Sequence, residues 1–213
     1  ADRSQAPKVA FVFANRVQPS AAQFKELYDS HPTFRSVLDR SAQLIGSRSE
    51  TLIDALSSPS ESTAQAVFAV EYAVAQLWKS WGVMPSAVLG EGVGEIVARA
   101  VAGAFRFEDA LRLAGVYAQP EAFARESSRI TTQEPLIDVI AETTDVAGAL
   151  AARDVRLLLE IGGTVAATST VEGRIAFNVS DPSMWDGLLD GLAALYVHGV
   201  EVNWANFDRD HGK

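Results

Sequence analysis

The sequence predicts an α/β protein in which a mostly parallel sheet carries helices on both faces. Compact apolar runs at Lys8–Phe13 and Val155–Ile161 are typical of buried parallel strands. Such runs alternate with longer segments whose apolar residues recur at helical spacing, which is the pattern of α/β proteins. A third apolar run ends in the glycine-rich turn 90–94 and leads into a helix-forming run, which indicates a strand, a tight turn and a helix.

The remaining elements are predicted from the same two patterns, which are compact apolar runs for strands and apolar residues at helical spacing for helices. The longest periodic segment, 61–81, is apolar on more than one face, as expected of a helix buried against the sheet. The segment 119–134 breaks the pattern, because its polar part has no convincing period. In chain order we expect further helices at 21–29, 32–45, within 47–60, and at 96–103, 107–118, 145–153 and 181–199, and strands at 136–141 and 174–179.

Composition limits the classes of partner and site. The 213 residues carry a net charge of -9, which argues against nucleic acid or an anionic membrane as the main partner. The chain has no cysteine, so it forms neither a disulfide nor a thiolate metal site. Its three histidines lack ligand spacing, and we predict no metal and no cofactor. No signal peptide or long apolar run is visible, and we expect a cytoplasmic protein.

Both ends of the chain are polar and resemble linkers. We therefore expect a linker at 1–7, a domain at 8–204 and a post-domain linker at 205–213, as in a domain that belongs to a larger protein.

The turn Gly90-Glu91-Gly92-Val93-Gly94 has the frame of a nucleophile elbow, G-x-S-x-G, in which small residues let a strained serine stand above the sheet. Gly92 occupies the position of the serine, and a glycine offers no side chain to acylate. A dinucleotide-binding turn is the rival interpretation. It would need a glycine where Glu95 stands, and Glu91 and Glu95 would repel a phosphate at the helix N-terminus.

Several blocks of sequence resemble, in the same order, the acyltransferase domains of modular polyketide synthases. The blocks are Lys8–Phe13, Phe68–Val83, Ala87–Glu95, Val101–Leu113, Ala151–Gly162 and Leu192–Trp204. The resemblance covers nearly the whole chain. It implies the hydrolase-like large lobe of an acyltransferase, a fold that moves acyl groups from coenzyme A to a carrier protein.

The chain departs from that family at each catalytic element. The family's elbow reads G-H-S-x-G, so Glu91 replaces its histidine and Gly92 replaces its nucleophile. The family's G-Q-G turn, which helps to build the oxyanion hole, corresponds to the turn around Arg16. The family's carboxylate-binding arginine corresponds to Tyr117, which cannot form a bidentate ion pair.

The catalytic histidine and the second lobe of the family are also missing. No histidine lies between His31 and His198, and the segment 119–144 is too short for the family's ferredoxin-like small lobe. We interpret this segment as the remnant of a largely deleted lobe. The resemblance therefore predicts a truncated, catalytically inactive acyltransferase-like domain without catalytic residues.

Three functions remain open at this stage. The first is an adaptor that packs against neighbouring polyketide synthase domains, or that docks a carrier protein or a separate acyltransferase. Aromatic residues near the C-terminus, Trp185, Tyr196, Trp204 and Phe207, would then provide surface for a neighbouring domain. The alternative is a divergent acyltransferase or hydrolase that uses Glu91. The third is a binder of acyl or pantetheine groups with a basic rim, for which Arg16, Lys79 and Arg99 are the candidates.

Overall fold

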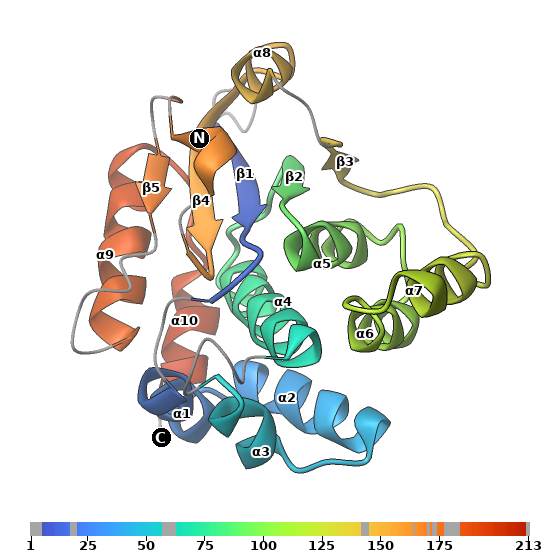
Figure 1. The fold of residues 1–213 in the computed structure, drawn as a ribbon. Coiled ribbons are helices and arrows are strands. Elements are labelled where there is room, and N and C mark those ends of the chain that lie inside the picture. Colours follow the sequence, from blue (N-terminus) through green and yellow to red (C-terminus); the bar gives the residue numbers. More distant parts are fainter. Residues whose placement is uncertain are drawn as a thin grey trace.

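In the part of the chain that the structure describes, five parallel strands form one sheet in the order β3-β2-β1-β4-β5, which confirms the predicted fold class (Figure 1). The computed structural model describes residues 6–17, 21–56, 63–141, 145–163, 165–169, 171, 174–176 and 184–211. The strands are β1 (Lys8–Phe13), β2 (Ala87–Gly90), β3 (Asp138–Val139), β4 (Val155–Ile161) and β5 (Arg174–Ala176).

The two faces of the sheet are both buried, because successive side chains of each strand point to opposite sides. On β1, Phe11 and Phe13 belong to the larger core, whereas Ala10 and Val12 belong to a second, smaller core. The larger core is built with most of the helices, and the smaller one is covered by α8 and the segment that follows β4. Helices cover both faces of the sheet, as expected, but most of them lie on the face of the larger core.

The helices in the described part of the chain mostly match the predicted ones. Their bounds are α1 (Ala21–Ser30), α2 (Pro32–Ile45), α3 (Ser49–Asp54), α4 (Ala64–Ser80), α5 (Val93–Val101), α6 (Phe107–Gly115), α7 (Pro120–Ser127), α8 (Val146–Ala151), α9 (Met184–Val197) and α10 (Trp204–His211). Helix α4 is buried along almost its whole length, as its apolar pattern predicts. The predicted helix start at 181–183 lies outside the described residues.

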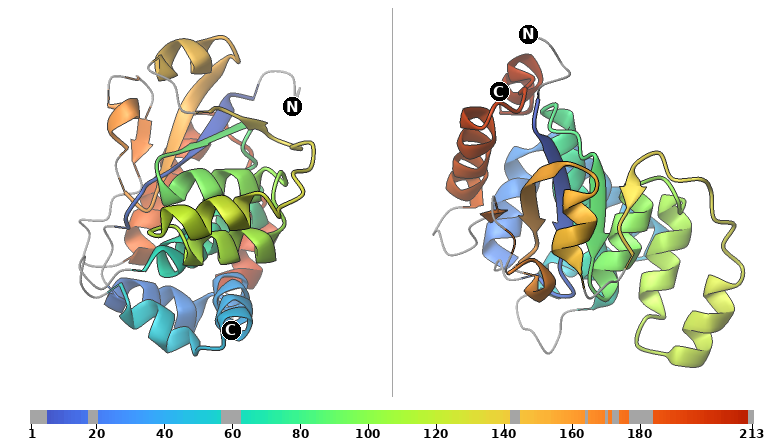
Figure 2. Two further views of the ribbon diagram at one scale, coloured as in Figure 1. Left: turned by 45° about the vertical axis from the view of Figure 1, so that its right-hand side comes forward. Right: turned by 90° about the horizontal axis from the view of Figure 1, so that it is seen from above.

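Helix α7 occupies part of the segment in which the sequence shows no period. Pro120 begins the helix, a position where its fixed φ is favourable and its missing N–H is not needed. Glu126 joins α7 to α6 through Arg112, with 3.5 Å between Arg112 Nη1 and Glu126 Oε1. Figure 2 shows α6 and α7 together beside α5, and the chain then returns to the sheet as β3.

The segment 204–211, most of which we expected to be a linker, forms α10 and contacts the body of the domain. The Phe207 ring lies 5.6 Å from Trp185 and 5.3 Å from Trp81, and Asn206 Nδ2 donates to the Ser80 carbonyl over 3.0 Å. The helix therefore packs on the end of α4. The predicted end of the domain at residue 204 stays a prediction.

Candidate functional site

The turn between β2 and α5 has the shape of an elbow, and Gly92 is its apex. Gly92 has φ 59° and ψ -119°, in the left-handed region where an L side chain is strained. The backbone leaves the end of β2 and enters α5 within two residues. The predicted strand, turn and helix are thus confirmed, with a glycine at the point where a nucleophile would stand.

The two outer glycines of the turn are explained by close backbone packing. A Cβ at Gly90 would lie 2.2 Å from the carbonyl of Gly94, and a Cβ at Gly94 would lie 2.4 Å from the carbonyl oxygen of Phe13. The ends of β1 and β2 and the first turn of α5 therefore meet without side chains between them. These two glycines are required for packing, whatever chemistry the turn performs.

The space above Gly92 is occupied by Asn15, which follows β1. The Val93 N–H donates to Asn15 Oδ1 over 3.1 Å. A Cβ at position 92 would lie 2.1 Å from Asn15 Oδ1, 2.4 Å from Asn15 Cγ and 3.0 Å from the Tyr117 hydroxyl. From the sequence we singled out Arg16 in this turn, but it is the preceding residue whose side chain reaches the elbow.

A buried carboxyl group holds the turn that carries Asn15. The Ala14 N–H donates to Glu71 Oε1 over 3.0 Å, and Glu71 is fully buried on α4. Burial raises the pKa of Glu71 well above its ordinary value, because desolvation disfavours the carboxylate form. A Cβ at Gly162, after β4, would lie 2.1 Å from the same carboxyl oxygen. Glu71 thus lies where the carboxyl ends of β1 and β4 meet α4.

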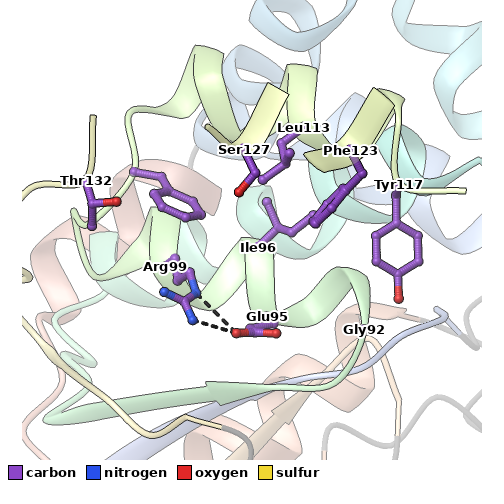
Figure 3. A pocket seen from close by; sticks show the side chains of 10 residues that line it. Gly92, Glu95, Ile96, Arg99, Leu113, Tyr117, Phe123, Ser127 and Thr132 are labelled. Atoms are coloured by element: carbon purple, nitrogen blue, oxygen red, sulfur yellow. Dashed lines mark hydrogen bonds and ion pairs between the residues drawn. The ribbon is translucent and has the colours of Figure 1, made fainter. Parts of the chain in front are cut away.

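A pocket of about 620 Å³ opens beside the elbow (Figure 3). The described residues that line it come from α5, α6, α7 and the adjoining loops, and they are Gly92, Glu95, Ile96, Arg99, Phe105, Leu113, Tyr117, Phe123, Ser127 and Thr132. Within the pocket Arg99 Nη2 lies 2.6 Å from Glu95 Oε1, and its guanidinium lies over the Phe105 ring. Arg99 is therefore already paired with the carboxylate of Glu95, and the two charges neutralise each other.

The other candidate residues from the sequence analysis do not lie together in the structure. Glu91 is half-buried, its N–H donates to the Phe13 carbonyl over 3.0 Å, and it is not among the described residues that line the pocket. Arg16 is exposed in the turn after β1. Lys79 is eight residues beyond Glu71 on α4, about 12 Å farther toward the opposite edge of the sheet. Only Arg99 of the three candidate rim cations lines the pocket.

Neither of the two histidines whose side chains are described lines the pocket. The His31 ring is buried 4.9 Å from Trp185 and 6.2 Å from Trp81, and its Nδ1 lies 2.8 Å from Ser30 Oγ. His198 Nδ1 lies 2.7 Å from the Ala194 carbonyl near the end of α9. The described residues contain no group of three or more side chains arranged to hold a metal ion, and none of their helices is both long and apolar enough to cross a bilayer.

Comparison with known families gives one extended match. The profile of the acyl transferase domain matches residues 18–143, which is more than half of the chain. A PKS-NRPS hybrid synthetase of Aspergillus niger is 33% identical over 166 residues, which are 72% of this chain and 9% of that protein. A conidial pigment polyketide synthase of Pestalotiopsis fici is 33% identical over 159 residues, 66% of this chain and 7% of that protein. The chain thus spans less than a tenth of the length of these relatives.

Solved structures share the fold at low identity. The acyltransferase domain from the second module of the salinomycin polyketide synthase superimposes with a TM-score of 0.80 and 20% identity, covering 94% of this chain and 76% of that one. The acyl transferase domain of ZmaA gives a TM-score of 0.79 and 18% identity, covering 99% of this chain and 79% of that one.

Proposed function

The chain belongs to the acyl transferase domain family of polyketide synthases, and on that premise we propose that it is a catalytically inactive, shortened member with a structural role. One observation carries the proposal: the apex of the elbow is Gly92, and the space for a side chain there is filled by Asn15. An acyl-enzyme intermediate needs a nucleophile at this point, and its tetrahedral oxyanion needs a free backbone donor. Neither is available in this arrangement.

The proposed partners are the neighbouring domains of the same synthase, with a carrier protein or a separate acyltransferase as further candidates. Large apolar side chains are exposed along the end of α9 and the start of α10, where Tyr196 is 56%, Val197 81% and Trp204 46% exposed. These residues lie on the segment whose aromatic content suggested a surface for a neighbour. Packing against another domain would remove this apolar area from water, which stabilises the assembly.

The first test is intact-protein mass spectrometry after incubation with malonyl-, methylmalonyl- and acetyl-coenzyme A. We expect no covalent adduct and no transfer of radiolabel to a carrier protein above the uncatalysed rate. An active acyltransferase domain treated in parallel shows that the reagents and the carrier are competent. A stoichiometric adduct on this chain would overturn the proposal and would direct the search to a displaced nucleophile.

A second function is favoured by the pocket beside Gly92, because an adaptor would have a shallow or filled cleft there. In this alternative the domain is a divergent acyltransferase or hydrolase that uses Glu91, or the pocket residue Glu95, as its acid or base. If turnover is observed, Glu91→Gln and Glu95→Gln should be compared, with Glu121→Gln on the exposed start of α7 as the control. Loss of turnover in only one of the first two variants would identify the group.

A further inference from the structure

Asn15 and Gly92 lie on different elements that meet at the carboxyl edge of the sheet. They are separated by most of the N-terminal half of the chain, and the parallel pairing of β1 with β2 brings them together. Asn15 Oδ1 accepts from the Val93 N–H over 3.1 Å. Val93 is the first residue of α5, and its N–H is one of the amides that a helix leaves without a partner of its own. The N-cap position of α5 is Gly92, and an N-cap side chain would reach the second or third helical amide and not that of Val93, so Val93 needs an acceptor from outside the helix.

The same carboxamide also fills the volume of a side chain at position 92. A Cβ there would lie 2.1 Å from Asn15 Oδ1 and 2.4 Å from Asn15 Cγ, far inside van der Waals contact. The N–H that follows an elbow nucleophile is one of the donors of an oxyanion hole. In this chain that donor is already bonded to an oxygen of the protein itself.

We propose that Asn15 and Gly92 form an exchanged pair, in which the side chain absent from position 92 is replaced by the side chain of Asn15. Asn15 caps α5 from outside the helix and occupies the position of a substrate oxygen at the elbow. The elbow therefore lacks a nucleophile, and its Val93 donor is occupied by the protein itself. This inference rests on the proposed function and deepens it, since it states which residue takes the place of the substrate oxygen at the inactive elbow.

The pair predicts a specific coupling that can be measured by a double-mutant cycle with Asn15→Ala and Gly92→Ala. The Gly92→Ala change adds a Cβ that collides with the exposed Asn15 side chain, which must then move and give up its bond to the Val93 N–H, and it also strains the backbone at positive φ. The Asn15→Ala change removes the collision but not the backbone strain. We expect Gly92→Ala to lower the folding equilibrium constant at least tenfold more in the native background than in the Asn15→Ala background. Urea unfolding, followed by tryptophan fluorescence, measures the folding equilibrium constant in each background.

Two matched variants separate this coupling from general effects. Gly103→Ala also adds a Cβ at positive φ, 80°, but its nearest neighbour is Leu136 Cδ1 at an ordinary 3.6 Å. Its effect should be the same with and without Asn15→Ala. Asn15→Asp keeps an acceptor oxygen in the same place, so Gly92→Ala should remain costly in that background.

A measurement on single variants stays informative even when a variant at position 92 fails to fold. Hydrogen exchange of the Val93 amide, followed by NMR, should become at least fivefold faster in Asn15→Ala and should stay slow in Asn15→Asp. Equal effects of Gly92→Ala in both backgrounds, or an unchanged Val93 exchange rate in Asn15→Ala, would overturn the exchanged pair. These outcomes do not depend on acyl transfer. An acyl adduct in the first test would contradict the proposed function, whereas an additive cycle here would contradict the exchanged pair.

Discussion

Glu71 links the turn that carries Asn15 to the interior through a fully buried carboxyl group. Its Oε1 accepts from Ala14, directly before Asn15, and its Oε2 is buried without a hydrogen-bond partner among the described residues. Burial disfavours the charged form of a carboxyl group, which is why the pKa of Glu71 is raised well above 4.5. The turn at the elbow is therefore held by a carboxyl group whose protonated form is favoured by burial.

The raised pKa of Glu71 predicts a pH-dependent stability. Below pH 4.5 the folded and unfolded chains both carry the proton, and the contribution of Glu71 is fully present. Above pH 4.5 the unfolded chain releases the proton first, so stability falls by about 1.4 kcal/mol per pH unit until the pH has risen through the folded pKa. Glu71→Gln removes the ionisable group and keeps an oxygen for Ala14. We expect the unfolding free energy of Glu71→Gln to rise relative to that of the native chain as the pH increases from about 4 to about 8.

Urea midpoints at pH 4, 6 and 8 measure this difference. Glu121→Gln, on the exposed start of α7, is the control and should follow the native chain at every pH. The net charge of -9 makes self-repulsion pH-dependent as well, but that effect is common to all three proteins. Parallel curves for Glu71→Gln and the native chain would show that Glu71 ionises in the folded protein.

The contact of α5 with the sheet predicts an unusual response of a helical glycine. Gly→Ala in a helix interior normally stabilises by up to about 1 kcal/mol. Gly94→Ala should instead destabilise by about 2–3 kcal/mol, because its Cβ would meet the backbone of Phe13 at 2.4 Å, where no side chain can move aside. Thermal unfolding of the purified variant measures the loss.

Gly115→Ala at the end of α6 is the matched control for this prediction. Its Cβ would meet only the end of the Gln65 side chain, 2.6 Å from Nε2, and that flexible group can turn away. We expect a change in unfolding free energy of less than about 1 kcal/mol. Equal losses in the two variants would show that α5 approaches the sheet no more closely than α6 approaches Gln65.

The elements predicted correctly from the sequence are those that a short stretch of residues identifies by itself. The strands at Lys8–Phe13 and Val155–Ile161 are mostly apolar and were predicted with their observed bounds, and the elbow followed from its glycines. Helix α7 was missed because none of its residues is buried, so no apolar period marks it. The role of Asn15 could not be predicted, because its contact with Val93 exists only after two distant strands have paired.

At the scale of the whole molecule, the C-terminal segment is tied to the body by aromatic packing. Phe207 of α10 contacts Trp81 at the end of α4 and Trp185 of α9, and His31 at the start of α2 contacts both tryptophans. Helices α2 and α4 from the first half of the chain thus share one cluster of rings with the C-terminal helices α9 and α10. Aromatic pairs of this kind contribute about 0.5–1.5 kcal/mol each beyond the area they bury.

This cluster predicts that α10 stabilises the entire domain and not only itself. Phe207→Ala should lower the unfolding free energy by about 2 kcal/mol, since Phe207 is half-buried, and should lower the midpoint of the near-ultraviolet and far-ultraviolet circular dichroism transitions together. Tyr196→Ala, at a side chain 56% exposed, should change the midpoint far less. An unchanged midpoint in Phe207→Ala would mean that the residues after Trp204 behave as a linker, as their polar composition suggested, and that the domain proper ends before α10.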